Sequence, residues 1–321
     1  MTSDSERTET QPESATARQI IAVGTAQGRH LGAVLLPRLE GSKRVSSAFI
    51  MSQLEIPAPV RFDIPPTGGD GSLVGFVGTP DDASLVPTWV LYLHGFGSSQ
   101  HGEKAEFFRR RCMAEGISFV SFDFQGHGLS GGSMRDLTVA RCLRDATRVR
   151  DHFASWADRP MVLMGSSMGA LVGLWFATTN SAAAGVFVAP ALGLDESFPA
   201  LIGAEGMRRW RESGVLPITN ELGTFDLGWG FVEDLRSRRS EDLLRGHRLP
   251  TVIFQGQLDD RVSWKVVERF ADDTPKLTRL VLFTDGDHRL LDKRSTVWSE
   301  TTSFLREQGL DAASISAGDS A

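Results

Sequence analysis

The pattern Gly-x-Ser-x-Gly occurs twice in this 321-residue chain, around Ser130 and around Ser167. A serine between two glycines can act as a nucleophile when a buried strand runs straight into a tight turn and a helix, because that turn lifts its hydroxyl above the edge of the sheet. The apolar run MVLM directly precedes Gly165, and an apolar segment with helical spacing follows Gly169. Ser130 lies several residues beyond its nearest apolar run, in GHGLSGGS. We therefore expect Ser167 to be the nucleophile and Ser130 to belong to a loop.

A serine hydroxyl is a weak nucleophile at neutral pH and needs a base, which an acid orients. His288 lies just after the apolar run RLVLFTDG, and it is better placed than the other six histidines. Asp259 and Asp260 follow the run TVIFQG. We expect His288 to be the general base and Asp259 the acid that orients it, with Asp260 as the alternative. Asp285 and Asp287 are expected to stabilise the turn around the histidine.

Two backbone amides are expected to bind the negative charge that develops on a substrate oxygen in the transition state. The first is the amide of Met168, directly after the nucleophile at a helix N-terminus. The second is the amide of Phe96, in the glycine-rich turn HGFG that leaves the apolar run TWVLYLH. Glycine in such a turn allows the backbone to approach a substrate closely. The amides of Phe96 and Met168 are therefore predicted to form an oxyanion hole.

Strand-length apolar runs alternate with helical segments and position these residues. The runs are apolar on both faces, which is typical of central parallel strands covered by helices; they cover 88–94, 117–124, 160–166, 183–190, 251–256 and 279–286. Before them, VRFDIP and SLVGFVGTP alternate around a PPTGGDG turn, which predicts a hairpin at the edge of the sheet. The chain is thus expected to be an α/β protein with a mostly parallel central sheet flanked by helices.

One connection is much longer than the others and predicts a cap. About 60 residues separate Pro190 from Pro250, and they include several large aromatic side chains that can cover a cleft. We therefore divide the chain into a disordered polar tail, an extension of uncertain structure, a core in two pieces, a helical cap or lid inserted between them, and a second disordered tail. The expected ranges are 1–18, 19–57, 58–194 with 249–308, 195–248 and 309–321.

Composition limits the classes of function. The net charge is −6, from 34 Lys and Arg against 40 Asp and Glu, which disfavours nucleic acid as a partner. No run reaches the roughly 18 to 20 apolar residues of a membrane span, so we expect a soluble protein. The start carries no pattern of a secretory signal. The two cysteines, Cys112 and Cys142, fall on apolar faces of expected helices, which favours reduced cysteines and a cytoplasmic location.

At these motifs the sequence resembles the α/β-hydrolase superfamily. The resemblance rests on HGF at 94–96, DFQGHGLSGG at 123–132, GSSMG at 165–169, GQLDDRV at 256–262 and DGDHRLL at 285–291, and it covers residues 60–306. GSSMG with the two later motifs is similar to the branch of palmitoyl-protein thioesterases and acyl-glucuronide esterases. The HGF turn instead resembles bacterial carboxylesterases and cinnamoyl esterases. The resemblance implies a serine hydrolase of acyl esters or thioesters, without a cofactor or metal, that uses Ser167, Asp259 and His288.

Cleavage of a small carboxylic ester through an acyl-serine is our first hypothesis. Thioester hydrolysis is the alternative, because it uses the same machinery. A serine peptidase is a weaker alternative, since no acidic cluster is clearly placed to bind a free amino terminus. A protein that keeps the fold but only binds a ligand would be indicated by a broken triad, whereas here each candidate is present in order. The aromatic insert favours short, medium or aromatic acyl groups.

Overall fold

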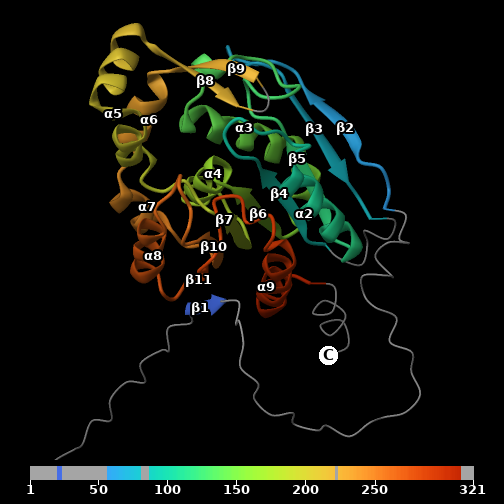
Figure 1. The fold of residues 1–321 in the computed structure, drawn as a ribbon. Coiled ribbons are helices and arrows are strands. Elements are labelled where there is room, and N and C mark those ends of the chain that lie inside the picture. Colours follow the sequence, from blue (N-terminus) through green and yellow to red (C-terminus); the bar gives the residue numbers. More distant parts are fainter. Residues whose placement is uncertain (1–19, 24–55, 81–86, 221–222, 312–321) are drawn as a thin grey trace, which may run out of the picture.

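One central sheet organises the molecule. The computed structural model describes residues 20–23, 56–80, 87–220 and 223–311. Nine strands lie in the order β1-β11-β10-β7-β6-β4-β5-β3-β2 (Figure 1). Their bounds are β1 Ile20–Val23, β2 Val60–Ile64, β3 Leu73–Gly78, β4 Trp89–Leu93, β5 Ser118–Phe122, β6 Met161–Ser166, β7 Ala184–Val188, β10 Thr251–Gly256 and β11 Thr278–Phe283.

The strand directions agree with the sequence pattern. All neighbours from β1 to β5 in the sheet order are parallel. Five of the six apolar runs each contain one of these strands, and the sixth overlaps β11, which begins one residue earlier at Thr278. β2 and β3 form an antiparallel hairpin, and β3 joins the sheet antiparallel to β5. The expected mostly parallel α/β sheet with an edge hairpin is confirmed, and it sets the nucleophile turn, the acid loop and the histidine loop at one edge.

Helices cover both faces of the sheet and define two hydrophobic cores. The helices of the core are α2 Glu103–Ala114, α3 Val139–His152, α4 Met168–Phe176, α8 Trp264–Asp273 and α9 Arg294–Glu307, with short 3-10 turns η1 Met134–Asp136 and η2 Ala154–Trp156. One core joins α3, α4, α8 and the cap to the sheet. The other joins α2 and α9 to the opposite face. Successive residues of a strand point to opposite faces, so Leu91 belongs to the first core and Tyr92 to the second.

The insert between β7 and β10 forms the cap. It contains α5 Leu194–Ser213, a separate hairpin of β8 Val215–Asn220 and β9 Gly223–Gly228, α6 Gly230–Ser237 and α7 Ser240–Gly246. The cap is thus helical as expected but also carries a two-stranded sheet. Asp234 of α6 accepts a hydrogen bond from the backbone N–H of Ala140 at the start of α3. This bond and the aromatic residues of the cap fix it to the core.

The ends of the chain are described only in part. The expected tail 1–18 and most of the extension 19–57 lie outside the described residues. Within the extension, β1 adds a strand parallel to β11. Residues 312–321 of the expected second tail also lie outside, whereas Leu310 is buried in the core on the α9 side. Cys112 and Cys142 are both buried and free. Within the described ranges, no helix has the length and apolarity that crossing a bilayer requires.

Candidate active site

Ser167 occupies a strained turn between β6 and α4. Its backbone has φ 55° and ψ −118°, a conformation that a non-glycine residue adopts only when its surroundings enforce it. The Ser167 N–H donates to the carbonyl of Val188 at 2.9 Å, and its carbonyl accepts from Leu171 and Ala191 at 3.1 and 3.2 Å. The turn is therefore held from β7 and from the helix. Ser167 precedes the first helical residue, yet its side chain does not cap the helix.

The two glycines of the pentapeptide allow this turn. A Cβ on Gly169 would lie 2.0 Å from the carbonyl oxygen of Leu93, at the end of β4. A Cβ on Gly165 would lie 2.8 Å from the backbone of Gly169. Side chains at either position would collide with backbone that cannot move without shifting the central strands. The glycines are thus required by close packing between strand and helix.

The structure brings Ser167, His288 and Asp259 together although they are far apart in sequence. His288 Nε2 lies 3.1 Å from Ser167 Oγ, and His288 Nδ1 lies 2.8 Å from Asp259 Oδ2. Since an ionised carboxylate only accepts hydrogen bonds, Nδ1 carries the proton and Nε2 is free to accept the serine proton. The His288 side chain is 20 % exposed, so a ligand can reach this edge of the sheet.

The side chain of Asp259 is fully buried, and both of its carboxylate oxygens accept hydrogen bonds. Oδ1 accepts the backbone N–H groups of Arg261 and Val262, both at 2.8 Å, and Oδ2 also accepts from Gln255 Nε2 at 2.9 Å. Burial raises the pKa of this carboxyl, but the hydrogen bond and charge of His288 and the two backbone amides outweigh burial. The net pKa lies below its ordinary value, so Asp259 is ionised at neutral pH.

The neighbouring acids have other roles. The Asp260 side chain is 78 % exposed and pairs with Arg261 at 3.4 Å, so it lies away from the histidine. Asp287 Oδ1 accepts the N–H groups of Arg289 and Leu290 and so closes the turn that presents His288. Asp285 pairs with Lys293 at 2.8 Å. Of the two candidate acids, the geometry places only Asp259 on the imidazole.

Two amides lie where an oxyanion hole is expected. In the described part of the chain, the N–H groups of Phe96 and Met168 have no hydrogen-bond partner. His94 supports the first of them: its Nδ1 donates to the Gly95 carbonyl at 2.8 Å while its Nε2 accepts the N–H of Phe124 at 3.0 Å. The Gly95 carbonyl and the Phe96 N–H belong to one trans peptide and point in opposite directions. His94 therefore turns the Phe96 N–H away from its own ring.

Buried neutral histidines hold this loop. Burial lowers the pKa of His94 to about 4, and burial together with the nearby His94 lowers the pKa of His127 to about 3. His127 Nε2 accepts the N–H of Gly97 at 3.2 Å. Asp123 binds the backbone and side chain of Gln100 at 2.7 and 2.9 Å. These bonds tie residues 94–100, called the oxyanion loop from here on, to the loop after β5. Both rings stay neutral at pH 7.

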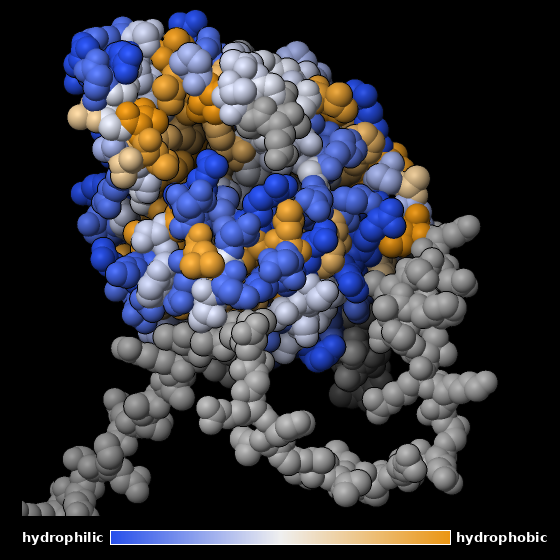
Figure 2. All heavy atoms as spheres, in the orientation of Figure 1, coloured by the Kyte–Doolittle hydropathy of each residue, from blue (hydrophilic) through white to orange (hydrophobic). Residues whose placement is uncertain are grey.

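The cap lies over the oxyanion loop. The ring of Phe96 packs against Phe225 of β9 and Phe231 of α6, with centroids 5.6 and 6.2 Å apart. Phe231 also contacts Phe198 of α5 at 6.2 Å. Figure 2 shows a hollow with hydrophobic side chains in its wall beside the cap. The wall of a binding site at this position is therefore apolar and aromatic.

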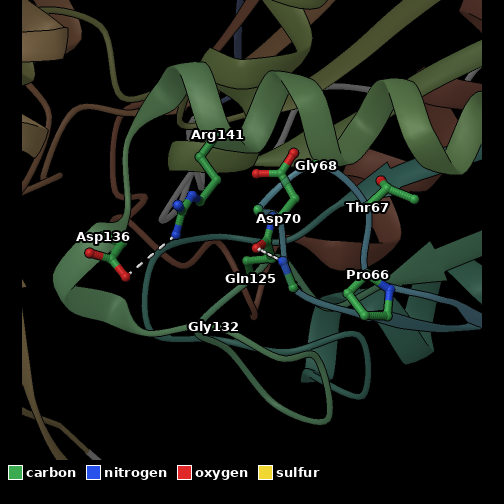
Figure 3. Close-up of a pocket in the computed structure, with 10 residues that line it drawn as sticks. Pro66, Thr67, Gly68, Asp70, Gln125, Gly132, Asp136 and Arg141 are labelled. Carbon is green, nitrogen blue, oxygen red and sulfur yellow. Dashed lines mark hydrogen bonds and ion pairs between the residues drawn. The ribbon is translucent and has the colours of Figure 1, made fainter.

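A polar cavity of about 380 Å³ lies elsewhere, between the β2–β3 hairpin and the start of α3. None of its lining residues belongs to the candidate triad of Ser167, Asp259 and His288 (Figure 3). Its charged groups largely neutralise one another, since Arg141 pairs with Asp136 at 3.6 Å and Asp70 with Arg144 at 3.3 Å. In the described ranges there is also no group of three or more His, Cys, Asp or Glu side chains that could hold a metal ion.

Three further residues, Gln255, His94 and Lys104, support the site and were not among its predicted members. Gln255 could have been noticed as the polar residue in an otherwise apolar strand, and it binds Asp259. His94 was assigned only to a turn, although its ring orients the Gly95 peptide. Lys104 lies among many charged residues of α2, and nothing in its spacing distinguishes it, yet its Nζ lies 2.7 Å from the hydroxyl of Ser166, next to the nucleophile.

Comparisons with known proteins agree with this architecture. Residues 87–221 match the family model described as "Serine aminopeptidase, S33". The bovine mitochondrial palmitoyl-protein thioesterase ABHD10 is 25% identical over 234 residues, which cover 68% of this chain and 75% of that protein. The structure of mouse ABHD10 has a TM-score of 0.61 at 19% identity and covers 78% of this chain and 99% of that one. Est1E from Butyrivibrio proteoclasticus, solved with ferulic acid, has a TM-score of 0.65 at 20% identity and covers 75% and 96%.

The solved structures among these matches show that the chain has the α/β-hydrolase fold.

Proposed function

We propose that the protein hydrolyses carboxylic esters through a covalent acyl-serine intermediate. The observation that carries this proposal is the continuous chain of contacts from Asp259 through His288 to Ser167, with 2.8 and 3.1 Å between the paired atoms. A serine, a histidine and a buried carboxylate in this order supply a nucleophile, a base and the group that orients the base.

In the acylation step, Ser167 Oγ attacks the ester carbonyl carbon while its proton moves to His288 Nε2. The carbonyl oxygen takes the negative charge and accepts hydrogen bonds from the N–H groups of Phe96 and Met168. Asp259 stabilises the imidazolium that forms. The carbon–oxygen bond to the alcohol then breaks, and the alkoxide takes the proton from Nε2 and leaves as the alcohol.

Deacylation repeats the same proton transfers with water. His288 Nε2 removes a proton from water as its oxygen attacks the acyl carbon, and the oxyanion again lies at the two amides. The bond to Ser167 Oγ breaks, Oγ recovers the proton from Nε2, and the carboxylic acid is released. Each group returns to its starting state, so this chain's own residues suffice for the reaction.

A fluorophosphonate probe gives a direct test. We expect Ser167 Oγ of the folded protein to displace fluoride from the phosphorus of the probe. The resulting phosphonyl adduct is seen as a mass increase of the intact protein. Ser167→Ala should remain unlabelled, whereas Ser130→Ala should be labelled as fast as the wild type. An unlabelled wild-type protein with a native circular dichroism spectrum would contradict the proposal and favour a non-catalytic binding protein.

Thioester hydrolysis is the second candidate, supported by the thioesterase named in the bovine relative. The same acyl-serine would form, with a thiolate in place of the alkoxide as leaving group. Turnover of matched oxygen and sulfur esters with the same acyl chain separates the two. A clear preference for the sulfur ester in kcat/KM, beyond the intrinsic difference in reactivity, would favour the thioesterase.

Peptide hydrolysis is a further alternative, since the matching family model carries the description of a serine aminopeptidase. Aminoacyl p-nitroanilides test it directly. We expect no cleavage, because the oxyanion loop is covered by Phe225 and Phe231 and by no acidic cluster of the described residues. Cleavage of the anilides at a rate comparable to that of esters would favour a peptidase over an esterase.

The aromatic wall supports a preference for short, medium or aromatic acyl groups. Phe96, Phe198, Phe225 and Phe231 lie in one connected set of ring contacts. A series of p-nitrophenyl esters from acetate to palmitate, with a cinnamoyl-type ester, measures this preference. Strict selectivity for palmitate would contradict it.

The cellular compartment is a separate proposal. Two free, buried cysteines fit a reducing environment, and we propose the cytoplasm. The curated relatives carry the word mitochondrial in their names. Fractionation of the source cells with an antibody to the protein distinguishes these locations.

A further inference from the structure

The first turn of α2 reaches the catalytic edge from the face of the sheet opposite the cap. Lys104 Nζ donates to Ser166 Oγ at 2.7 Å. Ser166 is the last residue of β6, is 5 % exposed, and directly precedes the nucleophile. Its side chain shares the sheet face of Val162 and Met164, which pack with α2 in the second core. Lys104 therefore holds the end of β6 from beneath the turn.

The neighbouring residue of α2 holds the histidine loop. Glu103 pairs with Arg289, the residue after His288, at 3.4 Å, and with Arg294 at the start of α9 at 3.3 Å. Two consecutive residues of one helix thus contact both segments that must meet for proton transfer.

Lys104 contributes a positive charge as well as a hydrogen bond at the end of β6. Among the described residues, its ammonium has no ion-pair partner, and its hydrogen-bond partner is the neutral hydroxyl of Ser166. The charged groups that face it are Glu103 of its own helix, Asp259 of the acid loop, and Asp287 and Arg289 on either side of the histidine. Burial and Arg289 lower the pKa of Lys104 to about 8, while the three carboxylates raise it. The charge is present at neutral pH and is lost as the pH rises through about 8.

We propose that Lys104 is a positioning residue for the catalytic constellation: its ammonium fixes Ser166 and the turn that carries Ser167, and its charge favours the neutral, proton-accepting form of His288. The part that concerns catalysis rests on the proposed function. Asp259 stabilises an imidazolium at His288, and a general base that is already protonated cannot accept the serine proton. The Lys104 ammonium interacts with the same Asp259 carboxylate and so offsets part of that stabilisation.

Titration of His288 by NMR tests the charge without any assumption about the substrate. The His288 imidazole signal, assigned by its loss in His288→Gln, is followed against pH in the wild type, Lys104→Met and Lys104→Arg. We expect the midpoint in Lys104→Met to lie above the wild-type midpoint, because a nearby cation disfavours the protonated imidazole. Lys104→Arg retains the charge and should keep the wild-type midpoint.

Lys265→Met is the matched control. Lys265 is exposed on α8 beside the ring of Trp264. Its substitution by Met also removes one positive charge and should leave the His288 midpoint unchanged. An equal midpoint in Lys104→Met and the wild type would overturn the electrostatic part of the proposal. This outcome is independent of whether the protein hydrolyses esters, so it is distinct from a failure of the proposed function.

Ser166→Ala tests the hydrogen bond and leaves the cation in place. We expect an unchanged His288 midpoint but a fall of about tenfold in kcat/KM for a p-nitrophenyl ester and in the fluorophosphonate labelling rate, because the turn is less well fixed. Urea unfolding establishes that the variant is folded. Wild-type labelling and kcat/KM in Ser166→Ala would overturn the positioning part, and this variant remains informative if Lys104→Met does not fold.

Discussion

The two Gly-x-Ser-x-Gly segments share a pattern but have different structures. Ser167 lies on a positive-φ turn between β6 and α4, with its hydroxyl on His288. The Ser130 hydroxyl instead donates to the carbonyl of Asp123 at 2.5 Å and accepts the N–H of Val74 at 2.9 Å. The Ser167 hydroxyl thus lies beside an imidazole, whereas the Ser130 hydroxyl joins two backbone segments.

The glycines of the two segments also have different packing roles. In the Ser167 segment they let a strand and a helix approach each other. In the Ser130 segment, Gly128 makes room for a carboxylate, since a Cβ there would lie 2.0 Å from Asp123 Oδ2. The same five-residue pattern thus has the geometry expected of a nucleophile only where a strand, a turn and a helix surround it.

Loss of the Ser167 hydroxyl gives the largest expected effect. Ser167→Ala should reduce kcat for a p-nitrophenyl ester by about 10⁵- to 10⁶-fold, because no other group can form the acyl intermediate. Ser130→Ala should stay within a few-fold of the wild type. Stopped-flow and long-time-course assays on both variants measure the contrast. Comparable losses in the two variants would remove the distinction between the segments.

Exchange of the acid should have the next largest effect. Asp259→Asn places an amide on His288 Nδ1 and favours the wrong tautomer, so kcat should fall by about four orders of magnitude. Asp260→Asn is the matched control, because Asp260 is exposed and lies away from the imidazole. We expect it to keep nearly full activity. If Asp260→Asn is the more damaging change, the assignment of the acid is wrong.

Much of the fold follows directly from the sequence. Runs that are apolar on both faces identified the six central parallel strands, and the PPTGGDG turn between alternating segments identified β2 and β3. The order of the loops along the chain then indicated which side chains would meet at the carboxyl edge. These features are local or follow from simple rules of sheet topology.

Other features depend on contacts that the sequence does not display. The choice between Asp259 and Asp260 follows from the loop after β10, where two backbone amides bind one carboxylate. The β8–β9 hairpin contains Pro217, which disfavours a strand, and it is stabilised by packing against η1, where a Cβ on Gly228 would lie 2.0 Å from the Arg135 carbonyl. Lys104 meets Ser166 only because α2 lies beneath β6.

Substitution of an elbow glycine tests why the Ser167 segment needs glycine. Gly169→Ala places a methyl group against the Leu93 carbonyl, and the free energy of unfolding should fall by about 3 kcal/mol or more. Gly230→Ala, where a Cβ meets nothing within 4 Å at the start of α6, should be neutral or stabilise by up to about 1 kcal/mol. Urea unfolding of both variants gives the comparison. Equal stabilities would mean that the strand and helix can separate at little cost.

Loss of the Ser130 hydroxyl should affect stability and leave catalysis nearly intact. Val74 is buried, so Ser130→Ala leaves its N–H without an acceptor and also removes the donor to Asp123. An unpaired buried N–H costs about 1 to 3 kcal/mol, and we expect the free energy of unfolding to fall by that amount. Ser237→Ala, which loses an exposed bond to the Asp234 carbonyl, should change it by less than about 0.5 kcal/mol. A Ser130→Ala protein as stable as Ser237→Ala would show that the Ser130 hydroxyl is dispensable for the fold as well as for the chemistry, because its two part-buried hydrogen bonds are what gives this hydroxyl a structural role.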